Sequence, residues 1–117
     1  MEDFVSFDLA KKLKEKGFDK YCCRAYSEIG CFNDTDTYKD SEEFYCYAPQ
    51  ISQVLKWLRE EKRIEVNACW DNFDAKWIGY ASEMEKPDLV GYYTSIDYDS
   101  YEEAAIASIN WTLDNLI

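Results

Sequence analysis

Two different spacings of apolar residues occur along this chain, and together they constrain its fold more than any other feature. Between residues 51 and 58 the apolar positions have the spacing of one helical face: Ile51, Val54, Leu55 and Leu58. From Ile64 to Ala68 apolar and polar residues alternate, which is the pattern of a half-buried strand. Both patterns within 117 residues predict an α+β fold.

Boundary signals locate three helices. Ser6 can cap the first turn of a helix over about 7–16, and Gly17 follows at a position where glycine commonly ends helices. Pro49 opens a second helix, where its missing N–H costs little. Ser100 begins the third with the capping box S-Y-E-E, whose glutamates also suit the positive end of the helix dipole.

Short aromatic and apolar runs predict strands on both sides of the second helix. Before it, Y-C-C-R-A-Y-S and F-Y-C-Y favour strands, and the polar, turn-rich residues between them predict a long hairpin connection. After it, the runs beginning at Ile64, Lys76 and Leu89 are separated by short turn signals. These three runs predict a meander.

The predicted order of elements is α-β-β-α-β-β-β-α. No repeat or flexible linker divides the chain, so we expect a single α+β domain over residues 1–117, with an antiparallel sheet and helices mostly on one face. Four residues of the last helix should face the sheet: Ala105, Ile109, Leu113 and Leu116. Trp111 lies on a second, smaller apolar face beside Ala104 and Ala107, where it is either covered by another element or exposed to a partner.

A net charge of −11 limits the partners of this chain. Nucleic acid and anionic membranes would be repelled within a Debye length of roughly 10 Å, so we expect neither as a direct partner. The same charge also serves solubility alone. The acidic N-terminus resembles no secretory signal and no 18 apolar residues run together, which predicts a cytoplasmic protein.

The chain contains no histidine, which excludes Ser-His-Asp and Cys-His catalysis and the H-E-x-x-H zinc site. No phosphate-binding glycine motif is present, and only four glycines occur in all. We therefore predict no catalytic residue, no cofactor and no metal. Carboxylate chemistry stays an alternative, because 24 acidic residues allow many pairs.

Five cysteines occur without C-x-x-C spacing: Cys22, Cys23, Cys31, Cys46 and Cys69. Such cysteines are most often small buried hydrophobes. Arg24 would lower the pKa of Cys22 or Cys23, whereas burial would raise it. The acidic loop 33–43 suggests a cation site, but the glycine of the EF-hand loop is replaced by Lys39, so a solvated loop is the alternative.

An acidic aromatic segment near the C-terminus is the best candidate for a binding surface. Tyrosines alternate there with aspartates and glutamates, and tyrosine gives a large contact area at low entropic cost. The candidate partner-binding residues are Tyr93, Tyr98, Tyr101, Glu102, Glu103 and Trp111. Packing of the tyrosines on the sheet, with the acids merely solvated, is the alternative for each position.

Three motifs occur in order along the chain: S-F-D-L-A-K-K-L-K-E-K-G-F, Y-A-P-Q-I-S-Q-V-L-K-W-L-R-E and Y-D-S-Y-E-E-A. With them the chain resembles a family of short uncharacterised acidic proteins from gut bacterial genomes and their phages and mobile elements. No activity is known for that family, so the resemblance implies a genomic context but no site residues.

From Pro49 onward, the expected order of a helix, three strands and an alanine-rich helix is similar to the double-stranded-RNA-binding domain. That family presents lysines to phosphates at the start of the last helix, where this chain has Tyr101, Glu102 and Glu103. Residues 71–117 hold ten acids and two lysines, a charge of −8. The resemblance therefore extends to the fold and not to RNA binding.

These observations favour a non-enzymatic protein-binding or adaptor protein. One concrete form is an acidic inhibitor of phage or mobile-element type that occupies a basic groove of its partner. A small ligand-binding domain or carboxylate enzyme is one alternative, and a structural homo-oligomer, such as a homodimer formed through Trp111 or a sheet edge, is another.

Overall fold

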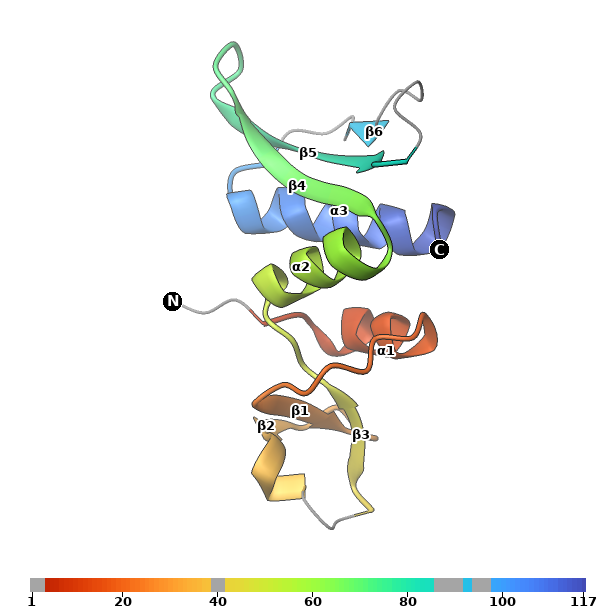
Figure 1. The fold of residues 1–117 in the computed structure, drawn as a ribbon. Helices are drawn as coiled ribbons and strands as arrows, with labels where there is room; N and C mark the ends of the chain where they lie inside the picture. Colours follow the sequence, from red (N-terminus) through yellow and green to blue (C-terminus); the bar gives the residue numbers. More distant parts are fainter. Residues whose placement is uncertain (1–3, 39–41, 86–91, 94–97) are drawn as a thin grey trace. The chain divides into compact units, whose positions relative to one another are not determined.

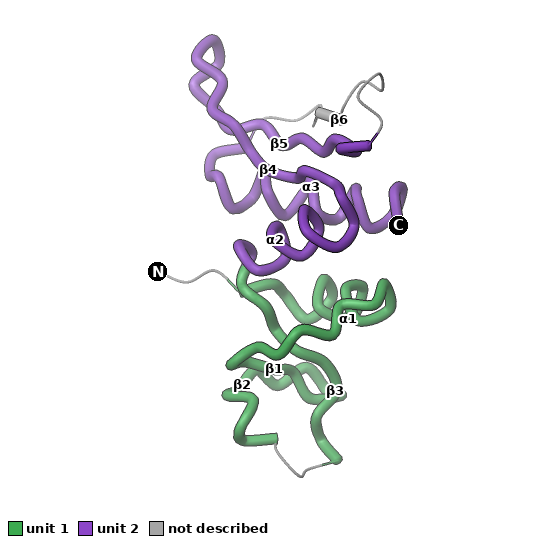
Figure 2. Tube along the Cα trace, in the orientation of Figure 1, with its two compact units in different colours: residues 1–50 green, residues 51–117 purple. Residues whose placement is uncertain are grey.

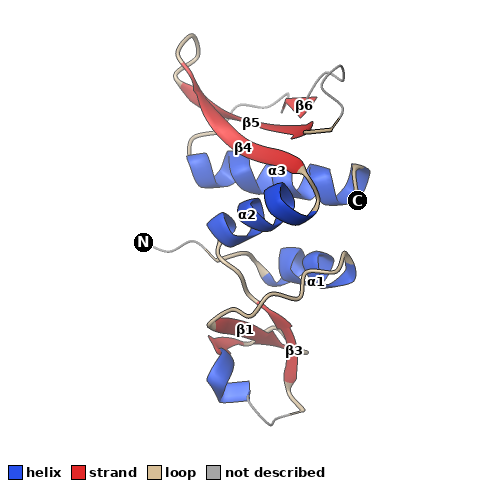
Figure 3. Ribbon diagram, in the orientation of Figure 1, coloured by secondary structure: helices blue, strands red, loops and turns tan. Residues whose placement is uncertain are grey.

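The computed structural model describes residues 4–38, 42–85, 92–93 and 98–117. The chain divides into two units, residues 1–50 and residues 51–117, coloured separately in Figure 2. Helices and antiparallel strands occur in both units (Figure 3), which confirms the α+β class. The single domain over residues 1–117 stays a prediction.

The first unit combines one α-helix with a small sheet. Its elements are α1 (Phe7–Glu15), β1 (Arg24–Ser27), β2 (Phe32–Asp34), the 3₁₀ helix η1 (Thr35–Tyr38) and β3 (Phe44–Tyr47). The strands form an antiparallel sheet in the order β2-β1-β3 (Figure 1). Strand β3 is therefore an edge strand among the described residues of this sheet.

Local capping fixes both ends of α1. The Ser6 hydroxyl accepts a hydrogen bond from the Leu9 N–H at 3.3 Å. Gly17 has φ = 95°, and the Phe18 N–H donates to the Leu13 carbonyl at 2.9 Å, which is the Schellman ending that glycine permits. The predicted helix and its two caps are confirmed.

The connection between β1 and β3 contains more structure than the sequence predicts. Gly30, with φ = 87°, lies in a tight turn after β1, and the three exposed residues of β2 follow it. The Thr35 hydroxyl then donates to the Cys22 carbonyl at 2.5 Å as η1 begins. The spacing of apolar residues does not predict strand β2, because its three exposed residues show no alternation of burial.

The second unit contains two helices and a second sheet. Its elements are α2 (Ile51–Glu61), β4 (Ile64–Asp71), β5 (Lys76–Glu83), β6 (Tyr92–Tyr93) and α3 (Tyr101–Asn115). The strands are antiparallel in the order β4-β5-β6, so the described strands make two sheets of three rather than one. Most of the predicted strand beginning at Leu89 lies outside the described residues.

Helix α2 begins two residues after Pro49. The Pro49 carbonyl accepts a hydrogen bond from the Val5 N–H at 3.0 Å, and Gln50 forms a β-bridge with Phe4. These extended pairings delay the start of the helix to Ile51. The predicted apolar face of α2 is confirmed, since all four of its residues are buried.

A glycine in β5 allows α3 to lie directly on the sheet. A Cβ atom at Gly79 would lie 1.9 Å from the Ser108 hydroxyl oxygen and 2.5 Å from the Ala104 carbonyl oxygen. The alternating burial of β4 matches this contact, because Ile64, Val66 and Ala68 are buried. Only glycine at position 79 permits so close an approach of helix and strand.

The buried face of α3 is wider and more polar than predicted. Its buried residues are Ala104, Ala105, Ser108, Ile109, Thr112 and Leu113. The Ser108 and Thr112 hydroxyls donate to carbonyls four residues earlier, at 3.0 and 2.8 Å, so both are satisfied within the helix. Trp111 is partly exposed. Ala104, which was predicted to lie beside Trp111 on a second apolar face, belongs to the buried face of α3.

No helix within the described ranges is long and apolar enough to span a membrane.

Replacing Gly79 with alanine tests the approach of α3 to β5. The added methyl group collides with the Ser108 hydroxyl and the Ala104 carbonyl, so we expect a loss of about 1–3 kcal/mol of unfolding free energy, as for other overpacked sites. Ser108→Ala in the same chain should restore part of this loss, since it removes the nearer obstacle. Urea unfolding of the two single variants and the double variant measures the coupling; strictly additive losses would contradict the contact.

Candidate interaction surface

Aromatic side chains gather at the end of the β4–β5 hairpin. Trp70 and Trp77 lie opposite each other in the ladder, with ring centroids 5.5 Å apart, and the Tyr101 ring lies 5.5 Å beyond Trp77. Phe73, in the loop between the strands, is 99% exposed, and Trp70 is 49% exposed. We call Trp70, Phe73, Trp77 and Tyr101 the hairpin aromatic cluster.

The loop that carries Phe73 has a defined conformation. The Phe73 N–H donates to an Asp71 carboxylate oxygen at 2.9 Å, and Ala75 has φ = 52°, in the left-handed region. Lys76 forms an ion pair with Asp99, which lowers the pKa of that carboxyl. Figure 1 shows this loop projecting beyond α2 and α3 within the second unit. Phe73 therefore lies on a turn that is held by a hydrogen bond from its own N–H to Asp71.

Residues before α3 are joined to the same end of β5. Backbone hydrogen bonds of 2.8 Å link Trp77 and Tyr98 in both directions. Ser100 then caps α3 by accepting the Glu103 N–H at 3.1 Å, as predicted. The start of α3 and the aromatic hairpin therefore form one continuous surface.

Tyr101 also reaches β4. Its hydroxyl donates to the side-chain oxygen of Asn67 at 2.5 Å, and the same oxygen accepts the Ala68 N–H at 2.9 Å. Burial raises the pKa of Tyr101, and the carboxylate of Glu102 adds to that rise. A hydroxyl that stays protonated and bonded holds the tyrosine ring against Trp77.

The sequence-predicted residues fall into three groups. Tyr101 belongs to the hairpin aromatic cluster and Tyr98 is bonded to its Trp77, while Glu102 is partly exposed and Glu103 is exposed in the first turn of α3. Tyr93 pairs with Tyr80 through the backbone, but the part of the chain that the structure describes does not include the Tyr93 side chain. Trp111 lies nearly three helical turns beyond Tyr101 on α3 and is only partly exposed.

Sequence reasoning missed Trp70, Phe73 and Trp77. The segment W-D-N-F-D-A-K-W supplies the turn signal between two predicted strands, and it also places its two tryptophans symmetrically about the turn. Paired positions at equal distance from a hairpin turn share one face of the sheet. That symmetry was the available signal for the cluster.

The chemistry of the remaining candidates is limited. Burial raises the pKa of the Cys22 thiol to about 11, with Cys23 nearby adding to the shift, so Cys22 has the inert character predicted for a buried position. In the acidic loop, Asp34 pairs with Arg24 at 2.8 Å, and Asp40 lies outside the described residues. Among residues that are described, no cluster of three acidic or cysteine side chains is arranged to hold a metal ion.

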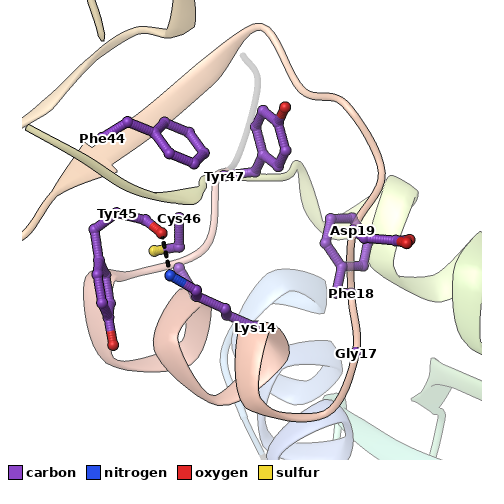
Figure 4. A pocket seen from close by; sticks show the side chains of 9 residues that line it. Lys14, Gly17, Phe18, Asp19, Phe44, Tyr45, Cys46 and Tyr47 are labelled. Carbon is purple, nitrogen blue, oxygen red and sulfur yellow. Dashed lines mark hydrogen bonds between the residues drawn. The ribbon is translucent and has the colours of Figure 1, made fainter. Parts of the chain in front are cut away.

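The first unit contains an open pocket of about 380 Å³ between the end of α1 and strand β3 (Figure 4). Four of its nine lining residues are aromatic, and Lys14 and Asp19 are the charged residues among them. The pocket is lined by Ala10, Lys14, Gly17, Phe18, Asp19, Phe44, Tyr45, Cys46 and Tyr47. The Lys14 amine donates to the Tyr45 carbonyl at 2.6 Å.

Comparisons with known proteins identify no relative: no family model matches the chain, and neither the curated proteins nor the solved structures contain a match.

Tyr101→Phe tests the bond between α3 and β4. It keeps the ring against Trp77 but removes the hydroxyl donor, so we expect a loss of about 0.5–1.5 kcal/mol of stability. Because the folded-state pKa is raised, this contribution is complete below the unfolded value of about 10 and is lost as pH rises through the folded value. Chemical denaturation of the variant and the wild type at each pH across about 8–11 measures it. An equal deficit at every pH would contradict the assignment.

Thiol alkylation tests the cysteine environments. Cys23 and Cys31 are exposed, so iodoacetamide should modify them first in the native protein. The buried Cys22 and Cys46, whose pKa values are raised by burial, should react at rates limited by unfolding. Peptide mass spectrometry over time gives the order, and rapid labelling of Cys22 without urea would refute it.

Proposed function

We propose that this chain is a non-enzymatic protein-binding protein whose contact surface is the hairpin aromatic cluster together with the start of α3. Its partner presents a basic surface. This surface extends the sequence prediction, which centred on the final strand and helix, to the neighbouring hairpin.

The exposure of Phe73 is the observation that carries the proposal. A phenylalanine that is 99% exposed contributes nothing to the packing of its own unit, and Trp70 beside it is half exposed. Phenylalanine and tryptophan are both enriched in protein–protein interfaces, and tryptophan is enriched among the residues that dominate binding energy. The ordered turn beneath Phe73 reduces the entropy lost on binding.

The charge around the cluster indicates the kind of partner. Asp71, Asp74 and Asp99 lie in or beside the hairpin end, and Glu102 and Glu103 follow in α3. Lys76 neutralises part of this charge through Asp99. An apolar contact surrounded by carboxylates complements an apolar pocket surrounded by lysine and arginine, and such charges accelerate and orient association.

The same acids support a protein rather than a nucleic acid as partner. Phosphate binding at the start of α3 would require cations there, and the first turn carries Glu102 and Glu103 instead. An acidic inhibitor of phage or mobile-element type, occupying the basic groove of another protein, fits this pattern.

Phe73→Ser tests the proposal. Since Phe73 is fully exposed, folding should be unchanged, whereas loss of a dominant contact costs about 2 kcal/mol or more, roughly a thirtyfold weaker affinity. We expect the immobilised chain to capture basic proteins from a bacterial lysate at low salt. This capture should be lost when the Phe73→Ser variant is immobilised instead, or when the salt is raised to about 0.5 M.

Ile29→Ser is the matched control, because Ile29 is 87% exposed but lies in the first unit. It should capture the same proteins as the wild type. Capture that survives both Phe73→Ser and high salt would refute the proposed surface.

A further inference from the structure

Strand β3 offers backbone groups along its outer edge. The Ala48 N–H donates to the Arg24 carbonyl at 2.9 Å, which places the hydrogen-bonded pairs of this ladder at alternate residues. Tyr47 lies between two such pairs, so its N–H and C=O point to the opposite edge. The Pro49 carbonyl also points outward, where it accepts the Val5 N–H.

A donor from outside the sheet already uses this edge. The Lys14 amine donates to the Tyr45 carbonyl at 2.6 Å and lies 4.0 Å from the centre of the Tyr45 ring (Figure 4). It thereby occupies the place that the N–H of an added strand would take. No other described strand pairs with β3 on this side.

The pocket runs between this edge and the end of α1. Gly17, Phe18 and Asp19 face Phe44–Tyr47 across it, and its volume of about 380 Å³ is within the range of ordinary binding sites. Helix and edge strand together form the two walls of a groove, the arrangement in which extended peptides add to a sheet. The four residues of β3 match about 13 Å of extended peptide.

Charge favours an acidic peptide in this groove. Residues 8–20 contain five lysines and three acids, a local charge of +2 in a chain whose net charge is −11. Lys14 enters the groove, whereas Figure 4 shows the Asp19 carboxylate directed away from Lys14. A carboxylate on the bound segment would therefore meet Lys14.

We propose that the groove between α1 and β3 binds an extended segment of a partner protein by strand addition to β3, with an aspartate or glutamate of that segment paired to Lys14. The segment's backbone bonds to Tyr47, and its apolar side chains contact the aromatic walls. This site lies in the first unit and does not rest on the hairpin surface of the second.

Two seven-residue probes test the proposal: acetylated and amidated Val-Thr-Val-Glu-Val-Thr-Val, and the same peptide with lysine in place of glutamate. We expect the glutamate peptide to bind the full chain about fivefold more tightly, because the exposed Lys14 attracts the glutamate and repels the lysine, and pairs of exposed charges are weak. Hydrogen exchange measured by NMR should show the Tyr47 N–H protected only in the bound state.

Three variants separate the contributions. Tyr47→Pro removes the outward N–H without touching the ladder to β1, so binding should be lost. Lys14→Glu should reverse the preference between the two peptides. Lys56→Glu, an equal charge change on an exposed position of α2, should leave it unchanged. Thermal unfolding of each variant shows whether it is folded. If Tyr47→Pro is unfolded, the peptide preference of Lys14→Glu still tests the proposal.

Other outcomes would overturn the proposal. Failure of both peptides to protect the Tyr47 N–H excludes strand addition, and an unchanged preference in Lys14→Glu excludes the carboxylate pair. Protection that rises with protein concentration in the absence of peptide shows that a second copy of the chain occupies the edge. None of these results affects the capture experiment with Phe73→Ser, so the two surfaces can fail separately.

Discussion

The second unit depends on the absence of a side chain at Gly79. Without a Cβ atom in that position, Ser108 and the backbone at Ala104 reach the surface of β5, and α3 lies on the hairpin with its small residues inward. A helix so close to the sheet brings Tyr101 beneath Trp77 and its hydroxyl to Asn67. One permissive residue thus connects the core of the unit to the aromatic surface at its end.

Two surfaces of different character follow from the two units. The hairpin of the second unit combines exposed aromatic rings with carboxylates, which suits a basic protein partner. The first unit has a lysine-flanked groove beside an open strand edge, which suits an acidic extended segment. On the two proposals made above, the units would bind protein surfaces of opposite charge.

Local signals in the sequence predicted the helices well. Each helix end that was predicted involves residues within five positions of one another: the cap at Ser6, the Schellman ending at Gly17 and the cap at Ser100. Such ends can be predicted from the sequence without knowledge of the tertiary structure. Strand β2 was not predicted, because three exposed residues carry no periodic signal.

The two proposed surfaces could be derived from the sequence only in part. Tyr98 and Tyr101 belong to the candidate surface as expected, but Trp70 and Phe73 join it only through the pairing of β4 with β5. The groove was missed entirely, because it brings Lys14 to Tyr45 across 31 residues of sequence. Such contacts between distant residues are set by the packing of whole elements, which spacing alone does not specify.

Amide hydrogen exchange across the second unit tests most directly whether α3 fixes the hairpin and so presents its aromatic cluster. Exchange resolved by NMR at each residue should be slowest in the buried face of α3 and the paired residues of β4 and β5, and much faster in the turn 72–75. Exchange in the middle of α3 as fast as in that turn would contradict the account, because the hairpin would then have no stable support.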